Sequence, residues 1–415
     1  MSQFYDALET RSPAEREAAH MAALPRQIAH AQQSSPAFAS ILAGVDAASI
    51  TSRAALAQLP VTRKYQLHER QQAERAHNAF GGFASIGFGA AMPRVFASPG
   101  PIYEPEGARA DYWRMARALY AAGFRAGELA HNCFSYHFVP AGSMMESGAH
   151  ALGCTVFPGG TGQTEQQVQA MAELRPAGYI GTPSFLKLIL EKAQAMGVAL
   201  PSLTKALVSG EAFPPSLRDW LAQHGVAGYQ CYATADLGLI AYETSAREGL
   251  VLDEGVIVEI VRPGTGDPVP EGEVGELVIT TLNPDYPLIR FGTGDLSAVL
   301  PGSCPTGRTN TRIKGWLGRA DQTTKVRGMF VHPGQIDQVV KRFPQVTKAR
   351  LVVSGEMAND QMTLQVETTE TAPGLAQLLA EALREVTKLR GEVEMLAPGG
   401  LPNDGKVIED ARSYR

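Results

Sequence analysis

Between residues 105 and 240 the sequence alternates helical segments with short apolar segments, and this alternation limits the fold more than any other feature. Short apolar strands separated by helices are typical of a parallel sheet that helices cover on its faces. The pattern therefore predicts an α/β domain built on a mostly parallel sheet. The predicted helices are Ala108–Ala122, Met144–Leu152, Gln163–Leu174 and Ser184–Met196, and the predicted strands are Leu129–Phe134, Thr155–Phe157, Gly178–Ile180 and Lys205–Val208.

The regions before and after this alternation have a different character. Residues 1–75 have helical patterns, and Ser12–Glu15 resembles a helix start with a capping serine, a first-turn proline and a closing glutamate. Between about 250 and 300, the segments Val256–Val261 and Glu276–Thr281 are separated by Pro and Gly turns. That arrangement predicts an antiparallel β subdomain.

The last hundred residues alternate strand and helix patterns again. They predict strands at Ala349–Val353, Gln361–Glu367 and Val393–Met395 and a helix at Leu375–Leu389. The chain is too long for one compact domain. We therefore expect a large domain over residues 1–320 and a small α+β domain over residues 322–415.

Composition excludes several classes of protein. Lys and Arg number 37 against 42 Asp and Glu, so the net charge of −5 leaves no basic surplus for nucleic acid or for an anionic membrane. The four cysteines are scattered without a CxxC pair, which fits a reducing compartment. No apolar run approaches the roughly 18 residues of a membrane span, and the N-terminus has no apolar signal core. We expect a soluble, cytoplasmic protein.

The strongest chemical signal lies between residues 286 and 328. Asp295 follows a Gly-Thr-Gly turn, and Arg319 comes about two dozen residues later. A carboxylate on a turn presents two acceptor oxygens to the vicinal hydroxyls of a ribose, and an arginine offers a bidentate fork to phosphate or ribose. Each residue alone is also compatible with an ordinary turn or surface position. Their order together favours a nucleotide site.

These segments resemble the phenylacetate–CoA ligase branch of the adenylate-forming acyl-CoA ligase superfamily. The resemblance covers nearly the whole chain, so it implies the family's fold: a large adenylate-forming N-terminal domain of α/β sheets with a small β subdomain, and a small hinged α+β C-terminal domain. It runs through Phe38–Lys64, Gly159–Glu165, Thr182–Ser184, Ser209–Glu211, Pro287–Leu296, Leu300–Thr309, Gly318–Asp321 and Arg327–Ile336.

The resemblance assigns roles to four residues near the C-terminal end. Asp295 would hold the ribose hydroxyls, Arg319 would act in catalysis at the ribose and phosphate, and Asp321 would be the hinge between the domains. Lys406, in a Pro-x-x-Gly-Lys context, would place a positive charge where the carboxylate attacks the α-phosphate. The plainer alternatives are a capping carboxylate for Asp321 and a solvated side chain for Lys406.

Two further segments fall on the family's nucleotide site. Ser209, Gly210 and Glu211 follow a predicted strand, and ligands of doubly wound sheets bind at such strand ends. The resemblance puts adenine beside this segment, and it adds Tyr232, Ala233 and Thr234 to the nucleotide-binding residues. A plain strand-to-helix turn at Gly210 is the alternative, and both can hold together.

The phosphate loop is where the chain departs from the family. The family has a Ser/Thr/Gly-rich stretch that ends in Lys, and its amides wrap the β- and γ-phosphates. Here the matching stretch reads ASPGPIYEPE, in which two prolines remove donors and Glu104 adds a negative charge. Ser98 and the Gly100 amide are the expected remaining phosphate donors, and Arg94 or Arg109 could offset Glu104.

The metal-binding positions also differ from the family. Its Tyr-Gly-x-Ser/Thr-Glu motif reads Tyr-Ala-Thr-Ala-Asp here, so Ala235 lacks the hydroxyl and Asp236 is the candidate magnesium ligand, one methylene shorter. Some members of the branch have residues for a zinc site, of which this chain keeps only Cys304. A single cysteine does not make a four-ligand site, so we predict no zinc.

Aromatic residues after a predicted strand are candidates for the acyl pocket. Phe134 and Tyr136 lie in this cluster, and Tyr136 matches a tyrosine in the aromatic-acid binders of the family. Core packing is the alternative role for such a cluster.

The resemblance implies an ATP-dependent aryl- or acyl-CoA ligase with ATP/AMP, Mg²⁺ and CoA as its ligands and a small carboxylic acid, expected to be aromatic, as its substrate. Two alternatives stay open. The first is a non-catalytic or impaired homologue that binds AMP, acyl adenylate or acyl-CoA, because the adenosine residues persist while the pyrophosphate residues are altered. The second is an adenylation enzyme that acts on a carrier protein. The sequence leaves the acid, the thiol acceptor and the oligomeric state open, a homodimer included.

Overall fold

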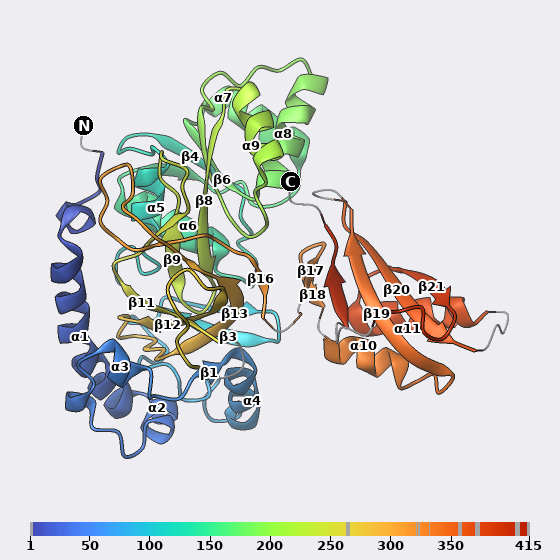
Figure 1. Cartoon of the computed structure of the whole chain (residues 1–415). Coiled ribbons are helices and arrows are strands. Elements are labelled where there is room, and N and C mark those ends of the chain that lie inside the picture. The colour runs from blue at the N-terminus through green and yellow to red at the C-terminus, as the bar shows by residue number, and fades with distance from the viewer. Residues whose placement is uncertain are drawn as a thin grey trace. The chain divides into compact units, whose positions relative to one another are not determined.

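The chain divides between Gly318 and Arg319 into Met1–Gly318, here unit 1, and Arg319–Arg415, here unit 2. The structure is a computed structural model that describes residues 3–262, 266–320, 322, 324–331, 333–355, 359–369, 374–402 and 407–412. Figure 1 shows its helices and strands. The expected large α/β part and smaller α+β part are both present, so the predicted fold class is confirmed.

The alternating segments form the parallel half of the larger sheet of unit 1. The pairs β5–β4, β4–β6, β6–β7 and β7–β8 are parallel, and the pairs from β8 to β14 are antiparallel. In order across the sheet the strands are β14 (Val299–Leu300), β15 (Arg312–Ile313), β10 (Leu250–Leu252), β9 (Gly238–Tyr242), β8 (Ala227–Thr234), β7 (Lys205–Val208), β6 (Gly178–Gly181), β4 (Leu129–Asn132) and β5 (Thr155–Phe157).

Helices follow the parallel strands, as the alternation predicts. In Figure 1, α7, α8 and α9 lie together beside β6 and β8. Leu119 of α5 and Met145 of α6 pack with Ile180 of β6 in one apolar core. The helices are α5 (Ala116–Ala121), α6 (Ala141–Ala151), α7 (Thr164–Leu174), α8 (Pro183–Ala195) and α9 (Pro215–Gln223).

The first of these helices starts later than predicted. The periodicity predicted a helix from Ala108, but α5 begins at Ala116. Asp111 and Arg114 have positive φ angles of 48° and 64°, which an α-helix does not allow. The Asp111 carboxylate accepts the Ala116 N–H at 3.2 Å. This side chain to backbone bond offers the chain an alternative to an earlier helical start.

The second sheet of unit 1 joins the β subdomain to the N-terminal region. Its strands run in the order β1 (Thr62–Arg63), β13 (Phe291–Ser297), β12 (Gly275–Thr281) and β11 (Val256–Val261). The β11–β12 and β12–β13 pairs are antiparallel, as predicted, and β1 adds a parallel partner to β13. The Gly-Thr-Gly-Asp segment, expected to be a turn, lies within β13, and Arg63 lies opposite its first residue, Gly292.

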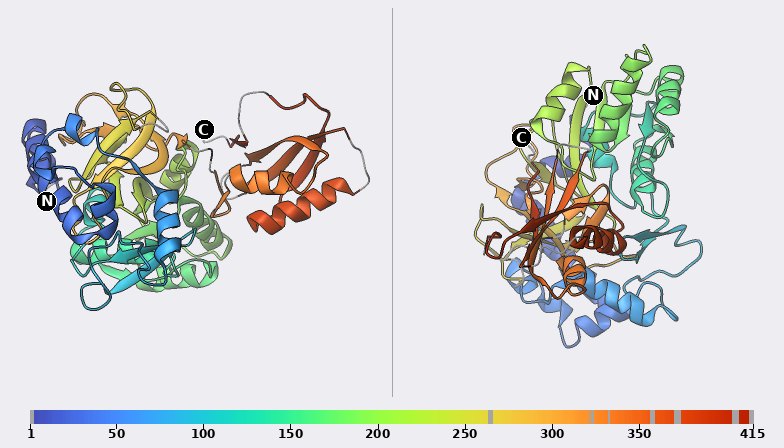
Figure 2. Two further views of the ribbon diagram at one scale, coloured as in Figure 1. Left: turned by 90° about the horizontal axis from the view of Figure 1, so that it is seen from below. Right: turned by 90° about the vertical axis from the view of Figure 1, so that its right-hand side faces the viewer.

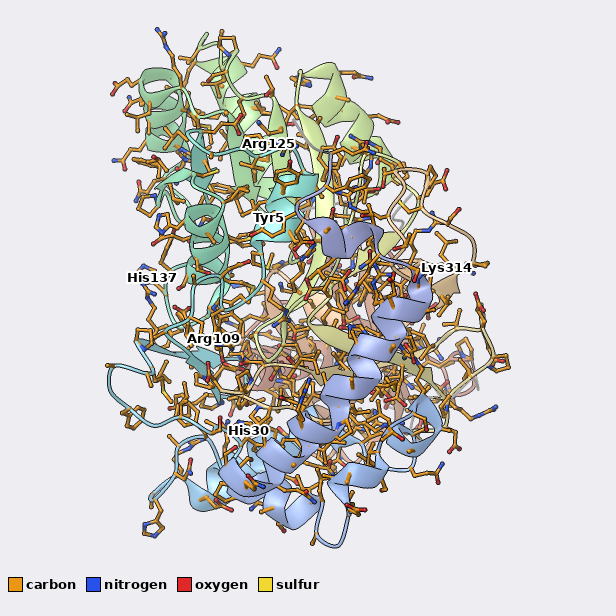
Figure 3. All side chains as sticks on the ribbon, turned by 90° about the vertical axis from the view of Figure 1, so that its left-hand side faces the viewer. Tyr5, His30, Arg109, Arg125, His137 and Lys314 are labelled. Carbon is orange, nitrogen blue, oxygen red and sulfur yellow. The ribbon has the colours of Figure 1, made fainter. Side chains whose placement is uncertain are left out.

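The N-terminal segment is mostly helical, and its first long helix has the predicted cap. Ser12 accepts the Glu15 N–H at 3.2 Å, and Glu15 accepts the Ser12 N–H at 2.8 Å. Figure 3 shows α1 across this side of unit 1, with His30 near the helix's C-terminal end. The elements are η1 (Ala7–Thr10), α1 (Pro13–Ser34), α2 (Pro36–Ile41), η2 (Ala47–Ser49), α3 (Arg53–Leu56) and α4 (Lys64–Glu74). None of the helices that the structure describes is long and apolar enough to cross a membrane.

The expected phosphate loop is instead a β-hairpin. Its strands β2 (Arg94–Ser98) and β3 (Ile102–Glu106) pair over their whole length, from Arg94 opposite Glu106 to Ser98 opposite Ile102. Only the Pro-Gly-Pro turn lies between them.

Unit 2 consists of a short hairpin and a four-stranded sheet with two helices. Figure 2 shows α10 and α11 on one face of this sheet. Val339 and Leu379 of the helices pack with Leu351 and Leu364 of the strands in one core. The hairpin is β17 (Thr324–Val326) and β18 (Met329–Val331), the sheet runs β21 (Glu392–Leu396), β20 (Gln361–Thr368), β19 (Val346–Ser354) and β22 (Ile408–Asp410), and the helices are α10 (Pro333–Val340) and α11 (Leu375–Thr387). The strand β16 (Gly318–Arg319) lies at the division between the units.

A buried arginine joins three parts of unit 1. Arg290, directly before β13, is almost completely buried. Its Nε and Nη2 donate to the Glu259 carboxylate on β11 at 3.0 and 3.1 Å. The same guanidinium donates to the backbone carbonyls of Ala57, Leu59 and Gly266. The side chain therefore fixes the β subdomain against the segment that precedes β1.

We expect Arg290→Met to lower the free energy of unfolding of unit 1 by about 3–5 kcal/mol, because it leaves the buried Glu259 carboxylate without its partner. Arg53→Met is the matched control, since the Arg53–Glu17 pair at 2.8 Å is exposed and should contribute about 1 kcal/mol or less. Urea unfolding followed by tryptophan fluorescence measures this, because all three tryptophans belong to unit 1. Equal losses in the two variants would contradict the role of Arg290.

Candidate active site

Two of the predicted nucleotide segments meet at the carboxyl ends of β7 and β8. Because these strands are parallel neighbours, Ser209–Glu211 after β7 lies beside Tyr232–Thr234 at the end of β8. The Ser209 hydroxyl donates to the Cys231 carbonyl at 2.8 Å and so joins the two segments. Glu211 accepts the Ser184 N–H at 2.7 Å, in the first turn of α8. The predicted adenine segment is thus held between a strand end and a helix start.

Gly210 lies beside one of the acyl-pocket candidates, Phe134. Its φ of +84° is a backbone conformation that L side chains rarely adopt. A Cβ atom at this position would lie 3.6 Å from the Phe134 ring and 3.8 Å from Thr182. Phe134, which is buried, therefore lines the same end of the sheet as Gly210.

The predicted ribose carboxylate is held by two donors. The Tyr232 hydroxyl donates to Asp295 Oδ2 at 2.7 Å, and the Trp316 indole N–H donates to Asp295 Oδ1 at 3.0 Å. The Asp295 N–H also donates to the Thr293 hydroxyl at 3.1 Å. These bonds fix the direction of the carboxylate and bring β13 to the end of β8. Asp295, Tyr232 and the Ser209–Glu211 segment therefore gather at one edge of unit 1.

Trp316 was missed by the sequence reasoning, which gave it no role in the site. The residue is 40% exposed, and its indole N–H donates to the Asp295 carboxylate. This contact joins residues 21 positions apart, which no local motif reveals.

The other acyl-pocket candidate is fixed through its hydroxyl. Tyr136 donates to the Glu146 carboxylate on α6 at 2.7 Å and accepts from the Asn132 amide at 2.8 Å. Burial raises the pKa of the Tyr136 phenol, and the Glu146 carboxylate raises it further. Nearby, His131 is bonded to Gln167 at 2.6 Å and stacks on Phe157. The Tyr136 ring is therefore held against α6.

The hairpin directs both Ser98 donors into the protein. The Ser98 N–H donates to Glu104 Oε2 at 3.1 Å, and the Ser98 hydroxyl donates to Glu104 Oε1. The sequence left Ser98 and the Gly100 amide as the expected phosphate donors. Of these, Ser98 is bonded to a carboxylate of the same chain, because its strand pairs with the strand that carries Glu104.

Glu104 belongs to a buried cluster of charged and polar groups. It is fully buried, and burial raises the pKa of its carboxyl to about 8, with the Asp236 carboxylate raising it and the Lys64 ammonium lowering it. Lys64 Nζ lies 2.7 Å from Asp236 Oδ2. Among the residues that the structure describes, Asp236 Oδ1 and the Tyr286 hydroxyl are buried without a hydrogen-bond partner. The cluster thus contains two carboxyl groups and one ammonium.

The arginines that were expected to offset Glu104 are paired elsewhere. Arg94 forms an ion pair with Glu106 at 2.8 Å, and Arg109 forms one with Asp285 at 3.0 Å. Lys64 supplies the cation instead. The sequence reasoning included Lys64 in the family resemblance without giving it a role, because the parallel pairing of β1 with β13 is not visible in the sequence.

Arg319 lies in β16, a short strand that pairs with β13, at the division between the units. Asp321 and Lys406 lie outside the described residues. Cys304 is buried, with its sulfur 3.7 Å from the Thr244 hydroxyl and 3.1 Å from the Thr306 hydroxyl. Over the described ranges, no group of three or more His, Cys, Asp or Glu side chains could hold a metal ion.

Comparisons with known proteins identify the family. The family model of the AMP-binding enzymes matches residues 110–283, and the model of their C-terminal domain matches residues 328–411. The phenylacetate–coenzyme A ligase of Thermus thermophilus is 32% identical over 84% of this chain and 80% of the relative. The enzyme of the same name from Aromatoleum evansii is 30% identical over 92% of this chain and 89% of the relative.

A solved structure is similar over the full chain. It is the crystal structure of a 2-hydroxyisobutyryl-CoA ligase in complex with 2-HIB-AMP and CoA, in the thioesterification state. The TM-score is 0.83 at 25% identity, and the match covers 100% of this chain and 93% of that one.

The buried cluster leads to a pH prediction for stability. Because the pKa of Glu104 is raised from 4.5 to about 8, the folded protein holds a proton that the unfolded chain releases, and stability falls as pH rises through this range. Glu104→Gln mimics the protonated acid, since its amide can both donate to and accept from Ser98. We expect the variant to gain roughly 2–4 kcal/mol over the wild type between pH 5 and pH 8.5.

Urea midpoints of both proteins at pH 5, 7 and 8.5, followed by tryptophan fluorescence, measure this gain. A difference between the two proteins that does not change with pH would show that Glu104 is ionised in the fold throughout.

Proposed function

Because the chain belongs to the AMP-binding enzymes, in the phenylacetate–CoA ligase family, we propose that it is an AMP-forming acid–thiol ligase with Asp295 as its ribose-binding group. The enzyme joins a carboxylic acid to CoA through an acyl adenylate. One observation carries the residue assignment: the Asp295 carboxylate is oriented by Tyr232 and Trp316. It lies at the same edge of unit 1 as the end of β8 and the neighbouring Ser209–Glu211 segment.

The reaction has two steps. A carboxylate oxygen of the acid attacks the α-phosphorus of ATP, a new O–P bond forms, and the bond to the β-phosphate oxygen breaks with pyrophosphate as the leaving group. The CoA thiolate then attacks the acyl carbon, and AMP leaves with the oxygen that joined it to the acid. Negative charge gathers on the α-phosphate in the first step, so a fixed cation lowers that barrier. Lys406 is our candidate for this cation, and Asp321 is our candidate hinge.

The adenosine part of ATP has the better-formed binding groups. We assign the ribose hydroxyls to Asp295, with Tyr232 and Trp316 as the donors that orient its carboxylate. Gly210 leaves room beside Phe134, because any side chain at this position would project toward that ring. We assign adenine to the segment from Ser209 to Glu211. Arg319 remains our candidate for the ribose–phosphate contact.

Magnesium fits one position in the described structure. Asp236 Oδ1 is buried without a partner, while Oδ2 is paired with Lys64. Mg²⁺ is commonly held by one or two carboxylates together with substrate phosphates, so Asp236 would hold it through Oδ1. The ion supplies charge neutralisation for the leaving pyrophosphate.

We propose that the acid is aromatic. The support is Phe134, whose buried ring lies beside Gly210, together with the ring of Tyr136 held by its bonds to Asn132 and Glu146. Flat apolar surfaces of this kind favour an aromatic ring over a charged or strongly hydrated acid. The relatives carry the names of a phenylacetate and a 2-hydroxyisobutyrate ligase, so both acids belong in any substrate test.

We further propose the cytoplasm as its location. ATP and CoA are available there, and the four described cysteines are free, buried thiols that suit a reducing compartment. A homodimer is compatible with this chemistry.

One observation favours a second function. Ser98 gives both of its donors to Glu104, so the part of the site that should hold pyrophosphate is filled by the chain itself. A protein of this kind could bind AMP, acyl adenylate or acyl-CoA and use ATP poorly. A carrier protein in place of CoA remains the third alternative.

Two assays on wild type and Lys406→Ala test the ligase. The first measures pyrophosphate release with ATP, Mg²⁺, CoA and a panel of acids that includes phenylacetate, benzoate and 2-hydroxyisobutyrate. The second measures acyl-CoA formation from a supplied acyl adenylate and CoA. We expect the wild type to perform both and Lys406→Ala to lose about 10²-fold or more of the first, while it largely keeps the second.

The outcomes separate the alternatives. Thioester formation without pyrophosphate release would favour the second function. Equal loss of both activities in Lys406→Ala would point to a structural role for Lys406. If the wild type performs neither reaction on the panel, the ligase assignment is wrong.

A further inference from the structure

The bonds between Ser98 and Glu104 have the form of an anion-binding contact. A backbone N–H and a hydroxyl of one residue both point at the two oxygens of a single carboxylate. Phosphate-binding loops offer the same kinds of donors to a nucleotide. We propose that the Glu104 carboxyl takes the place of a nucleotide phosphate on Ser98, so that unit 1 selects adenosine monophosphate esters over ATP. The inference rests on the proposed nucleotide site at Asp295.

The hairpin holds this contact in place from both of its edges. The buried Gln71 side chain of α4 accepts the Tyr103 N–H and donates to the Tyr103 carbonyl, each at 2.8 Å. On the other strand, the Ala97 N–H donates to the Phe138 carbonyl at 2.7 Å. Ala97 and Tyr103 are opposite each other in the hairpin, so each strand is bonded to a neighbouring segment at the same residue pair. The hairpin cannot open without breaking these bonds.

The charges of the cluster also oppose a triphosphate. Glu104 and Asp236 are two buried acidic residues, and Lys64 is paired with Asp236. A β- or γ-phosphate brought near Ser98 would have to displace the Glu104 carboxyl from the same donors. It would also approach the buried Asp236 carboxylate, and like charges at close range in a buried site repel strongly. AMP and acyl adenylate carry no β- or γ-phosphate, so they do not meet this repulsion.

ATP and acyl adenylate therefore differ in what they require of the hairpin. ATP enters the phosphate region only if a phosphate replaces Glu104 on Ser98. The displaced Glu104 carboxyl group would then be buried without its hydrogen-bond donors. AMP and acyl adenylate carry only the α-phosphate and leave the contact intact. The protein thus favours transfer of the acyl group from the adenylate to CoA over formation of the adenylate from ATP.

Binding calorimetry of Mg-ATP and AMP to the full chain tests this directly, without acid or CoA. For the wild type we expect AMP to bind at least as tightly as ATP. For Glu104→Ala, which frees both Ser98 donors, we expect the Kd of ATP to fall about tenfold, equivalent to about 1.4 kcal/mol, while the Kd of AMP stays unchanged. Glu104→Gln mimics the protonated acid and keeps hydrogen-bonding groups on Ser98, so it should leave both Kd values unchanged.

Glu106→Gln is the matched control. Glu106 is a buried carboxylate two residues further along β3, and its partners are Arg94, Trp113 and Ser143. Its substitution should leave the ratio of the two Kd values unchanged. Urea midpoints of all variants verify that each is folded under the conditions of the titration.

The possible failures are distinguishable. Wild-type protein that binds ATP much more tightly than AMP, or a ratio of the two Kd values that Glu104→Ala leaves unchanged, contradicts the role of Glu104 alone. Wild-type protein that binds neither nucleotide contradicts the ligase function, and the inference with it.

Discussion

The buried guanidinium of Arg290 is the interaction on which the described site depends. It joins the Glu259 carboxylate of β11 to backbone carbonyls of the segment before β1, at the point where β13 begins. The residues directly after it form β13, within which Asp295 lies, so the position of the Asp295 carboxylate follows from where Arg290 is held. The same packing brings β1 beside β13, and with it Lys64 to the Asp236 carboxylate. A single buried ion pair thus sets the geometry of both ends of the nucleotide site.

The two ends differ in how their polar groups are satisfied. At the adenosine end, Asp295 accepts from Tyr232 and Trp316 and lies at the edge of the sheet. At the end proposed for the phosphates, the chain satisfies the Ser98 donors itself through Glu104, and Asp236 Oδ1 has no partner among the described residues. A buried donor that already has an acceptor gains little when it exchanges that acceptor for another. On our proposal, this difference lets one fold keep an acyl-adenylate site while it weakens its hold on a triphosphate.

Much of the fold follows from patterns that the sequence displays. The strands Thr155–Phe157 and Lys205–Val208 have the bounds that their apolar residues predict, because a covered parallel strand needs only a short apolar run. Ser12 and Glu15 form the expected cap because capping is a local interaction. The late start of α5 was missed, since the helical periodicity did not reveal the positive φ angles of Asp111 and Arg114.

The part of the site that belongs to local sequence motifs was also predictable. Asp295 and Tyr232 belong to motifs that can be recognised from neighbouring residues, and the structure brings them within hydrogen-bond distance. The hairpin was not predicted, because Pro99 and Pro101 suggested a loop and nothing local indicates that Gln71 pairs with Tyr103. Glu104 was expected as an obstacle to phosphate, but its bonds to Ser98 depend on strand register. Lys64 and Trp316 needed long-range contacts that only the folded chain provides.

The central claim is that the acid is activated as an acyl adenylate, and the path of an oxygen atom tests it most directly. The acid is labelled with ¹⁸O in both carboxylate oxygens and incubated with the protein, ATP, Mg²⁺ and CoA until acyl-CoA has formed. If the carboxylate attacks the α-phosphorus, each AMP released carries one ¹⁸O, which mass spectrometry detects. Acyl-CoA formed with unlabelled AMP, and with the label in inorganic phosphate instead, would contradict the account.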